Sequence, residues 1–437
     1  MAIHISEVKN NIGKEVAVHG FAQVIRDQGK IAFIQLRDVS GLIQIVVTKE
    51  DMSVLETAQS LSLESVIEVT GLAKEAAQAQ GGIEIEAKKI VVISMAEPEL
   101  PIPLFEKGSQ EEADQSVRLD WRFIDLRKPK NTLIFKVWTA MEQAFREYWT
   151  SNGYIEIHSP KLISTASETG AEVFEVKYFD RKAYLAQSPQ FYKQMANAAG
   201  FEKVFEVGPV FRAEPSFTTR HATEFVGYDA EWSYINSHED VMAEEEKTIA
   251  YVVEKVKAQY GEQIKELCDR EVVVPTLPFP RISIADAKVI LKERGVPSEK
   301  EGDLSPEEER AIAAYALEKY NNEFVFITDY PISVRPFYHM RHEDNPGLTK
   351  SFDLLWNGLE ITTGAQREHR YDVLIAQAKE KGMNLEHLEF YTNFFRYGCP
   401  PHGGYGMGPN RMLMKLMNLE NVREASFVYR GVKRLTP

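Results

Sequence analysis

The sequence predicts an α+β protein, with a small all-β domain at its N-terminus and a larger domain that mixes strands with amphipathic helices. Residues 1–100 contain short runs of alternating polar and apolar residues, separated by turn residues. Residues 101–130 begin with prolines and an acidic, polar run, which indicates a hinge. From 131 to 437, apolar residues recur at helical spacing between strand-like segments. We therefore expect three parts with these boundaries, and a helical insertion at about 238–320 within the last.

The composition is that of an ordinary globular protein, because 44% of the 437 residues are hydrophobic and 27% are charged. The chain has neither a run of about 18 apolar residues nor a signal-peptide pattern, so we expect a cytoplasmic protein without a membrane span. Cys268 and Cys399 lie far apart without metal-ligand spacing, which argues against a disulfide and a structural zinc. The net charge of -14 argues against indiscriminate binding to a polyanion, yet it permits recognition of particular nucleotides.

The first 100 residues are expected to form a closed barrel. The expected strands are 15–24, 31–37, 42–47, 66–72 and 83–93, with one helix at 49–61. Five strands with a helix after the third are typical of the OB-fold, which often binds single-stranded nucleic acid. Phe33, Gln44 and Glu84 lie on the second, third and fifth of these strands. Taken alone, Phe33 is better explained as a core residue.

The larger domain opens with a predicted amphipathic helix at 132–152, which has apolar residues at helical spacing. The segment GYIEIHSPKL at 153–162 follows as a predicted strand that ends at Pro160. By pattern alone, this pair is a helix and an edge strand of a hydrophobic core.

Two neighbouring segments suit a small charged ligand. The first, ISTASETGAEVF at 163–174, is rich in small residues and carries one conspicuous carboxylate, Glu168. The second, QSPQFYKQ, places Ser188, Gln190 and Lys193 within a short window. A lysine with three donors beside a glutamine with donor and acceptor suits a zwitterion that carries an extra carboxylate. The alternative for Lys193 is a solvated surface lysine.

The segment VFEVGPVFRAEPSFTTRHATEFVGYDAEW at 204–232 predicts two antiparallel strands joined by a polar loop. Alternation along the strands sends a cation and a carboxylate to the same face. The side chains that could contact a ligand are Arg212, Glu214, Arg220, His221, Phe225 and Asp229. Guanidinium groups match phosphate oxygens and an aromatic ring stacks on a base, so a phosphorylated aromatic ligand would suit this surface. The alternative is an exposed hairpin with solvated charges.

The segment SFDLLWNGLEITTGAQREHR at 351–370 carries two carboxylates seven residues apart, Asp353 and Glu360. If two strands bring them together, they form an oxygen-only pair that suits Mg²⁺. A salt bridge for each carboxylate is the alternative. After a predicted turn that includes Thr363, Arg367 follows seven residues beyond Glu360.

The last informative segment, PPHGGYGMGPNRMLMKLMNL, predicts a glycine-rich turn that runs into an amphipathic helix, with Arg411 at the helix start. Glycines permit close approach of the backbone to a ligand, and a helix N-terminus favours an anion.

Together these motifs resemble the class II aminoacyl-tRNA synthetases, in particular the aspartyl, asparaginyl and lysyl subgroup and its archaeal type of aspartyl enzyme. FRAE, a loop, TRH and D-x-E resemble motif 2. The helix, strand and proline at 132–162 resemble motif 1, and G-x-G-x-x-R resembles motif 3. The resemblance covers nearly the whole chain and implies a catalytic domain with an antiparallel sheet flanked by helices. Five positions depart from the family pattern: Trp121, Pro215, Ala365, Asn410 and Tyr429.

The resemblance implies that the chain activates L-aspartate with ATP and transfers it to the 3′ end of tRNA-Asp. It implies ATP binding by Arg212, Glu214, Arg220, His221, Phe225, Glu360 and Arg411, of which Arg212 and Arg411 are catalytic. It implies aspartate binding by Glu168, Ser188, Gln190, Lys193, Asp229, Thr363 and Arg367. It further implies Mg²⁺ on Asp353 and Glu360, anticodon contacts from Phe33, Gln44 and Glu84, and a homodimer formed through 132–162.

Other activities remain open at this point. In an asparaginyl enzyme, Lys193 and Arg367 would have to bind the side-chain amide of asparagine. A tRNA-independent ligase would be expected to lack the barrel, and a catalytically silent paralogue would explain the departures from the family pattern. Whether aspartate is also attached to tRNA-Asn is undecided. Enzymes of this type either accept tRNA-Asp alone (discriminating) or accept tRNA-Asn as well (non-discriminating), and Gln23 and Gln80 match neither kind. Phe21 also replaces the usual tryptophan.

Overall fold

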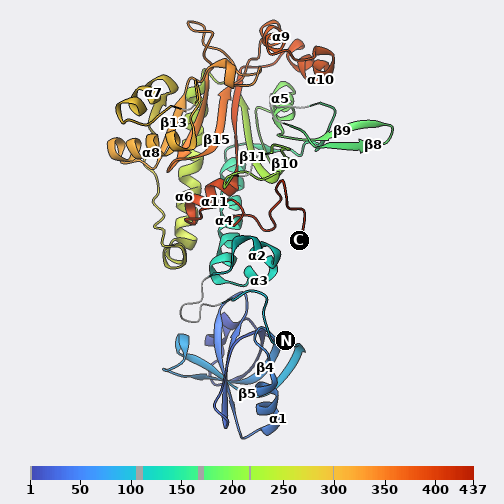
Figure 1. Cartoon of the computed structure of the whole chain (residues 1–437), viewed down its shortest axis with the longest axis vertical. Coiled ribbons are helices and arrows are strands. Elements are labelled where there is room, and N and C mark those ends of the chain that lie inside the picture. Colours follow the sequence, from blue (N-terminus) through green and yellow to red (C-terminus); the bar gives the residue numbers. More distant parts are fainter. Residues whose placement is uncertain (1, 105–111, 166–171, 216–217, 299) are drawn as a thin grey trace. The chain divides into compact units, whose positions relative to one another are not determined.

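The computed structural model describes residues 2–104, 112–165, 172–215, 218–298 and 300–437. It divides into two compact units, Met1–Pro103 and Leu104–Pro437. The first is mainly β-structure, and the second combines a large sheet with helices on its faces (Figure 1). The predicted α+β class is confirmed.

The first unit is a closed five-stranded barrel with the strand order β1-β2-β3-β5-β4. Its elements are η1 (Ile5–Asn11), β1 (Glu15–Asp27), β2 (Ile31–Arg37), β3 (Leu42–Thr48), α1 (Met52–Ser60), β4 (Val66–Glu75), η2 (Gln80–Gly82) and β5 (Ile83–Ser94). Asp51 caps α1 by accepting hydrogen bonds from the backbone N–H groups of Ser53 and Val54. The OB-fold predicted from five strands and a helix after the third is therefore confirmed.

The second unit is built on an eight-stranded sheet with the order β12-β13-β14-β15-β16-β11-β10-β6. Its strands are β6 (Ile155–Glu156), β10 (Lys203–Phe211), β11 (Glu224–Ser233), β12 (Arg281–Ser283), β13 (Phe324–Thr328), β14 (Ser351–Trp356), β15 (Leu359–Gln366) and β16 (His402–Met407). The inner pairs are antiparallel, as predicted, but β6 and β12 join the two edges in parallel, so the sheet is mixed. A smaller sheet has the order β7-β9-β8, with β7 (Leu162–Ile163), β8 (Glu175–Tyr178) and β9 (Arg181–Leu185).

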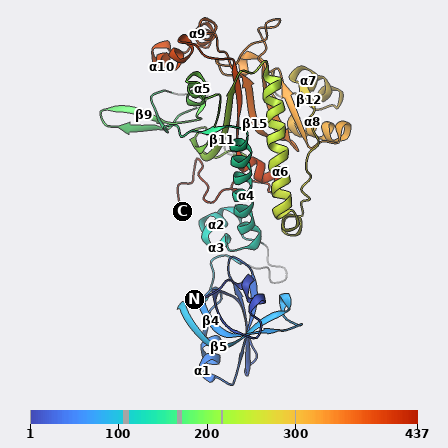
Figure 2. The same cartoon turned by 180° about the vertical axis from the view of Figure 1, so that it is seen from behind.

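Helices cover the large sheet unevenly, and this leaves room for a site. The helices are α2 (Gln115–Asp120), α3 (Arg122–Asp125), α4 (Pro129–Ser151), α5 (Gln190–Ala198), α6 (His238–Cys268), α7 (Ile284–Glu293), α8 (Pro306–Tyr320), η3 (Ile332–Val334), α9 (Tyr371–Glu380), α10 (Leu385–Arg396) and α11 (Pro409–Leu416). The long helices α4 and α6 lie side by side against one face (Figure 2). Along β11, Tyr228 and Ala230 pack into their core, whereas Phe225, Gly227 and Asp229 point to a cavity on the opposite face.

Three local predictions from the sequence were wrong. The single strand predicted at 153–162 is two short strands, β6 and β7, in different sheets. The glycine-rich segment before Arg411 is strand β16 in the middle of the large sheet, and the predicted turn at Thr363 lies inside β15. A Cβ on Gly404 would overlap the carbonyl of Ala230, so this glycine allows close strand packing and does not form a turn.

The region 238–320 contributes to the large sheet and to its core. It contains α6, whose buried face includes Val241, Ile249 and Val252, and β12, which pairs with β13. Helices α7 and α8 pack against β13 in a separate apolar cluster. Among the described residues, no helix has both the length and the apolar character needed to cross a lipid bilayer.

Candidate active site

A cavity of about 290 Å³ lies on the sheet face opposite α6 and collects most of the residues that the sequence singled out. Those lining it are Ser188, Gln190, Arg212, Glu214, Arg220, His221, Phe225, Asp229, Glu360, Thr363, Arg367 and Arg411. Lys193 and Asp353 lie just behind this wall and contact lining residues. Glu168 lies outside the described residues. The roles implied for these side chains stay predictions.

At one end of the cavity, two buried cations are held by two carboxylates of β11. Lys193, only 1% exposed, donates from Nζ to Asp229 Oδ1 (2.8 Å) and lies 3.1 Å from Glu231 Oε2. Arg367, 3% exposed, donates from Nε to Glu231 Oε1 (2.8 Å) and from Nη2 to the carbonyl of Gly404 (2.9 Å). Asp229 and Glu231 lie on one face because alternate residues of a strand share a face, and Glu231 contacts both cations. We call this group of four charges the amino-acid end, after the ligand that the resemblance implies for it.

The charge states at the amino-acid end follow from burial and pairing. Burial raises the pKa of Asp229, and the nearby Lys193 offsets this only in part. Burial also acts to raise the pKa of Glu231, but Arg367 and Lys193 outweigh it and lower the pKa below its ordinary value. Glu231 is therefore an anion that holds both cations. Sequence reasoning placed Glu231 on the correct strand face but gave it no role.

A buried histidine that the sequence analysis missed also fixes Arg367. Nη1 of Arg367 donates to His339 Nε2 over 2.9 Å. Burial, reinforced by Arg367 and Arg335, lowers the pKa of His339 well below its usual range. The imidazole is therefore neutral and accepts at Nε2, so Nδ1 carries the proton. No spacing in the sequence links residue 339 to residue 367, whose backbones also meet in an isolated β-bridge.

The other end of the cavity carries Arg212, Arg220 and Arg411, and we call it the nucleotide end, after the ligand that the resemblance implies for it. The guanidinium carbon of Arg212 lies 5.6 Å from the ring centre of Phe225. Arg411 donates to the carbonyl oxygen (2.9 Å) and to Oε1 (3.1 Å) of Glu360. Arg220 donates from Nη1 to Oε2 of Glu309 on α8 over 2.6 Å.

Glu309 was not predicted as a site residue, because it lies in the region to which the sequence analysis assigned no chemistry. Burial raises the pKa of Glu309 to about 7, although Arg220 opposes this. The Arg220–Glu309 pair therefore loses its anion when the pH falls below neutrality.

The predicted metal carboxylates lie on neighbouring strands, Asp353 on β14 and Glu360 on β15. Oδ2 of Asp353 accepts from Arg335 over 2.6 Å, whereas its buried Oδ1 has no hydrogen-bond partner among the described residues. Burial raises the pKa of Asp353; for Glu360 burial acts the same way, but Arg411 and Arg335 bring its pKa below the ordinary value. An oxygen-only donor set with a free buried carboxylate oxygen fits a hard divalent cation such as Mg²⁺.

The three residues expected to contact an anticodon lie on the outer surface of the barrel. Phe33 is half-buried between the inward-facing Ala32 and Ile34, and it is not part of the barrel core. Gln44 and Glu84 are opposite each other in the parallel β3–β5 pair, and the Gln44 amide donates to the Glu84 carboxylate over 2.9 Å. An exposed ring beside a polar pair can stack on a base and bond its edge.

Two of the departures from the family pattern have structural roles near the cavity. The amide of Asn410 donates to the carbonyl of Ala425 over 3.1 Å and so fastens the C-terminal segment. The hydroxyl of Tyr429 donates to the carbonyl of His221 over 3.1 Å. Ala365 is buried and is not among the described residues that line the cavity, so its methyl group does not narrow it.

Comparisons with known proteins agree with this geometry. Residues 114–428 match the family model described as tRNA synthetases class II (D, K and N), and residues 16–93 match the OB-fold nucleic acid binding domain. The aspartate–tRNA(Asp/Asn) ligase of Aeropyrum pernix is 44% identical, over 99% of this chain and 98% of its own. The aspartate–tRNA(Asp) ligase of Pyrococcus abyssi is 42% identical with the same coverage of both chains.

A solved structure shares the fold from end to end. The asparaginyl-tRNA synthetase of Pyrococcus horikoshii, complexed with asparaginyl-adenylate, superposes with a TM-score of 0.90 at 33% identity and covers all of both chains. The shared fold thus spans enzymes named for aspartate and for asparagine, and amino-acid specificity has to be argued from the site. The chain belongs to the class II tRNA synthetases of the D, K and N group and is an aminoacyl-tRNA synthetase.

Proposed function

We propose that this chain is an aspartate–tRNA ligase, which activates L-aspartate with ATP and transfers the aspartyl group to the 3′ end of tRNA-Asp. The observation that carries this proposal is the amino-acid end, where Lys193 and Arg367 are fixed inside the cavity wall by Asp229 and Glu231. Two cations at one end of a cavity complement a ligand with a side-chain carboxylate. The names of the two archaeal relatives support the same substrate.

The chemistry requires no protein nucleophile, because the carboxylate of aspartate itself attacks the α-phosphorus of ATP. Phe225 and Arg411 hold the adenine between them, and Arg212 stabilises the charge that develops on the α-phosphate. Arg220 and His221 bind the pyrophosphate that leaves. Mg²⁺ held by Asp353 and Glu360 supplies further neutralisation of the phosphate oxygens when it is bound.

An asparaginyl enzyme is the main rival, because the fold is shared with one. An amide in place of the carboxylate would leave Lys193 and Arg367 with one anion fewer in a buried site. Leaving buried charges underpaired costs about 1.5–3 kcal/mol or more, which corresponds to a preference for aspartate of at least tenfold. The intact barrel argues against a tRNA-independent ligase, because such an enzyme would be expected to lack it.

For the tRNA, we propose tRNA-Asp as the substrate and tRNA-Asn as a second candidate, since the relatives carry both kinds of name. Gln23 is buried, and its side-chain oxygen accepts from Arg37 over 3.1 Å, while Arg37 pairs with Glu64. Gln23 is therefore held inside the barrel, and the exposed Gln80 is the better candidate to contact the tRNA.

The proposed assembly is a homodimer through the region 132–162. Strand β6 lies at an edge of the large sheet, and its Ile155 is 50% exposed. Leu162 on β7 is 46% exposed. Exposed apolar residues on edge strands favour association with another chain. Light scattering during size-exclusion chromatography will measure a mass near twice 49.8 kDa if this is right.

The experiment that tests the substrate is ATP–pyrophosphate exchange with aspartate and with asparagine as the amino acid. We expect exchange with aspartate and a kcat/KM for asparagine lower by at least tenfold. Lys193→Gln removes one of the two cations and is expected to reduce this preference. Faster exchange with asparagine would contradict the proposal, and no exchange with either would favour the silent paralogue.

A further inference from the structure

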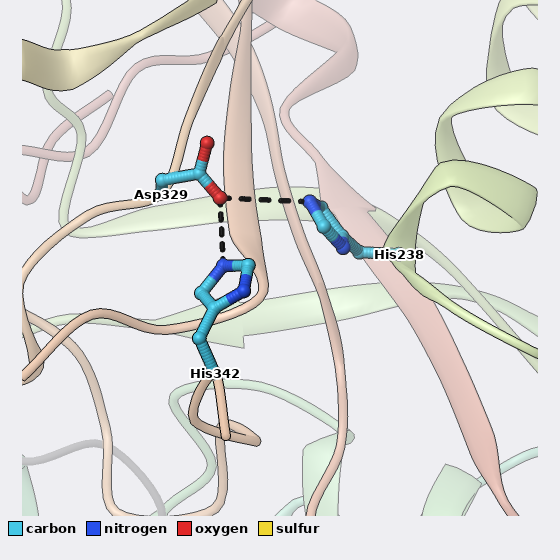
Figure 3. A group of neighbouring side chains, drawn as sticks. All are labelled: His238, Asp329 and His342. Atoms are coloured by element: carbon cyan, nitrogen blue, oxygen red, sulfur yellow. Dashed lines mark hydrogen bonds and ion pairs between the residues drawn. The ribbon is translucent and has the colours of Figure 1, made fainter. Parts of the chain in front are cut away.

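Three potential metal ligands converge away from the cavity, at the end of β13 (Figure 3). His238 is the first residue of α6, Asp329 follows β13, and His342 belongs to the segment between β13 and β14. One ligand atom from each lies within 4.8 Å of the others. None of the three lines the cavity described above.

The distances bracket those of a tetrahedral metal site. Oδ1 of Asp329 lies 2.7 Å from His342 Nε2 and 3.7 Å from His238 Nε2. Ligands bound to zinc at 2.0–2.1 Å in tetrahedral geometry are about 3.4 Å apart. Shifts of about 0.3 Å and about 0.7 Å would therefore bring these two separations to the tetrahedral value, and the two imidazole nitrogens lie within 4.8 Å of each other.

Each ligand is anchored by its own backbone contact. The N–H of Asp329 donates to the carbonyl of Ser351 (3.0 Å), and this holds Asp329 in the left-handed conformation at φ 64°. The N–H of His342 donates to the carbonyl of Leu348 (3.1 Å), and Ser237 caps the helix that His238 begins.

A neighbouring hydroxyl group orients the carboxylate of Asp329. The hydroxyl of Thr328 donates to Oδ2 of Asp329 over 2.6 Å, which leaves Oδ1 turned towards both histidines. Arg281 and Lys350 are the nearby cations, and Arg281 is itself 3.0 Å from Glu239.

We propose that His238, Asp329 and His342 bind one zinc ion, with the fourth position open to water. Two imidazoles and a carboxylate form a nitrogen and oxygen donor set that zinc prefers over magnesium. The sequence analysis argued against a structural zinc because it considered only cysteines, and two histidines 104 residues apart give no recognisable spacing. A bound ion would link the start of α6 to the segment between β13 and β14. The same segment carries His339, which contacts Arg367.

The test is titration of the chelator-treated full chain with Zn²⁺ alone, followed by calorimetry and by competition with a chromogenic chelator. We expect one ion per chain with a Kd below about 1 µM, and Co²⁺ in its place should give the visible absorption of a tetrahedral site. His342→Gln and Asp329→Asn should each weaken binding by about 100-fold or more. His387→Gln removes a histidine that is exposed on α10, so it is the matched control and should bind like the wild type.

A wild-type Kd weaker than about 100 µM would overturn the proposal and leave a hydrogen-bonded His342–Asp329 pair. Unchanged binding in both variants would overturn it as well. Thermal unfolding separates a folding defect from a lost site: zinc should raise the midpoint of the wild type and of His387→Gln, but not that of Asp329→Asn.

Discussion

The two ends of the active-site cavity bind their charges differently. At the amino-acid end, Lys193 and Arg367 are almost fully buried, and each contacts a carboxylate and a backbone carbonyl. At the nucleotide end, Arg220 and Arg411 are half-buried. Arg220 pairs with a carboxylate, Arg411 contacts both the carboxylate and the carbonyl of Glu360, and Arg212 lies over an aromatic ring. Both ends contain cations, but only those of the amino-acid end are almost fully buried.

Under the proposed function, this difference has a physical reason in what each end would recognise. Aspartate and asparagine differ by one charged group, so discrimination depends on cations whose positions do not adapt to an amide. ATP brings several negative charges and magnesium, so the nucleotide end needs cations that can exchange a protein carboxylate for a phosphate. We therefore expect substitutions at the first end to change selectivity and those at the second to change ATP affinity.

The largest effect is expected from Arg367→Ala. This change removes the fork that faces the substrate carboxylate and leaves Glu231 with one cation fewer. Aspartate-dependent pyrophosphate exchange should fall by more than about 1000-fold, while ATP binding measured by calorimetry stays within about threefold.

Arg367→Lys is the matched variant, because it keeps the charge beside Glu231 and removes only the planar fork. It should retain the fold and lose about 100-fold in kcat/KM for aspartate. Exchange at the wild-type rate in either variant would remove Arg367 from aspartate recognition and would contradict the separation of the two ends.

A substitution in the barrel tests whether tRNA recognition is independent of both ends. Phe33→Ala removes the exposed ring, and loss of one base stack costs about 1–3 kcal/mol. We expect kcat/KM for tRNA-Asp to fall by about 5- to 150-fold, with pyrophosphate exchange unchanged. Ala32, which points into the barrel core, is unsuitable as a control; Phe179→Ala, at an exposed position in the other unit, should leave charging intact. Equal losses in charging and exchange would refute this assignment.

A smaller effect is expected from Glu309→Gln at the nucleotide end. The amide holds Arg220 less strongly than the carboxylate does, so the arginine is more available to phosphate. We expect the KM for ATP to fall by about two- to fivefold, which corresponds to a surface-like ion pair of about 0.4–1 kcal/mol, with the KM for aspartate unchanged. A rise in the KM for ATP would show that Glu309 positions Arg220 for the nucleotide.

The pH dependence of stability gives the smallest expected difference. The pKa of Glu309 in the folded chain, about 7, is above its ordinary value of 4.5. Its contribution to stability is therefore complete below pH 4.5 and is lost as the pH rises through 7. Between pH 5 and 7 the free energy of unfolding should fall more steeply with rising pH in the wild type than in Glu309→Gln. The two slopes should differ by at most about 1.4 kcal/mol per pH unit. Parallel profiles in urea unfolding would contradict the raised pKa.

How much of this could be predicted from the sequence depends on how local each feature is. The β10–β11 hairpin follows from alternation within one segment, and it is confirmed. The two strands that the sequence analysis required for Asp353 and Glu360 are also present. The residues lining the cavity were named through motifs, and their roles remain predictions. Glu309 and His339 were missed because their partners are 89 and 28 residues away, and local periodicity gives no information about such pairs.

Glycine was the other source of error. A glycine is equally compatible with a turn and with a strand that a neighbour approaches closely. In this chain Gly364 and Gly404 lie in strands, where a Cβ would overlap Phe352 or Ala230. The true turn between β14 and β15 is Asn357-Gly358, where both residues have positive φ, and this Asn-Gly signal was present in the sequence.

The most direct test of the central claim is aminoacylation of tRNA-Asp and tRNA-Asn transcripts with labelled aspartate, with labelled asparagine as the control. We predict that aspartate is attached to tRNA-Asp and that asparagine is attached to neither transcript. Attachment of aspartate to tRNA-Asn as well would identify a non-discriminating enzyme, and it would still agree with the claim that the chain is an aspartate–tRNA ligase. Attachment of asparagine, or of no amino acid to either transcript, would contradict it.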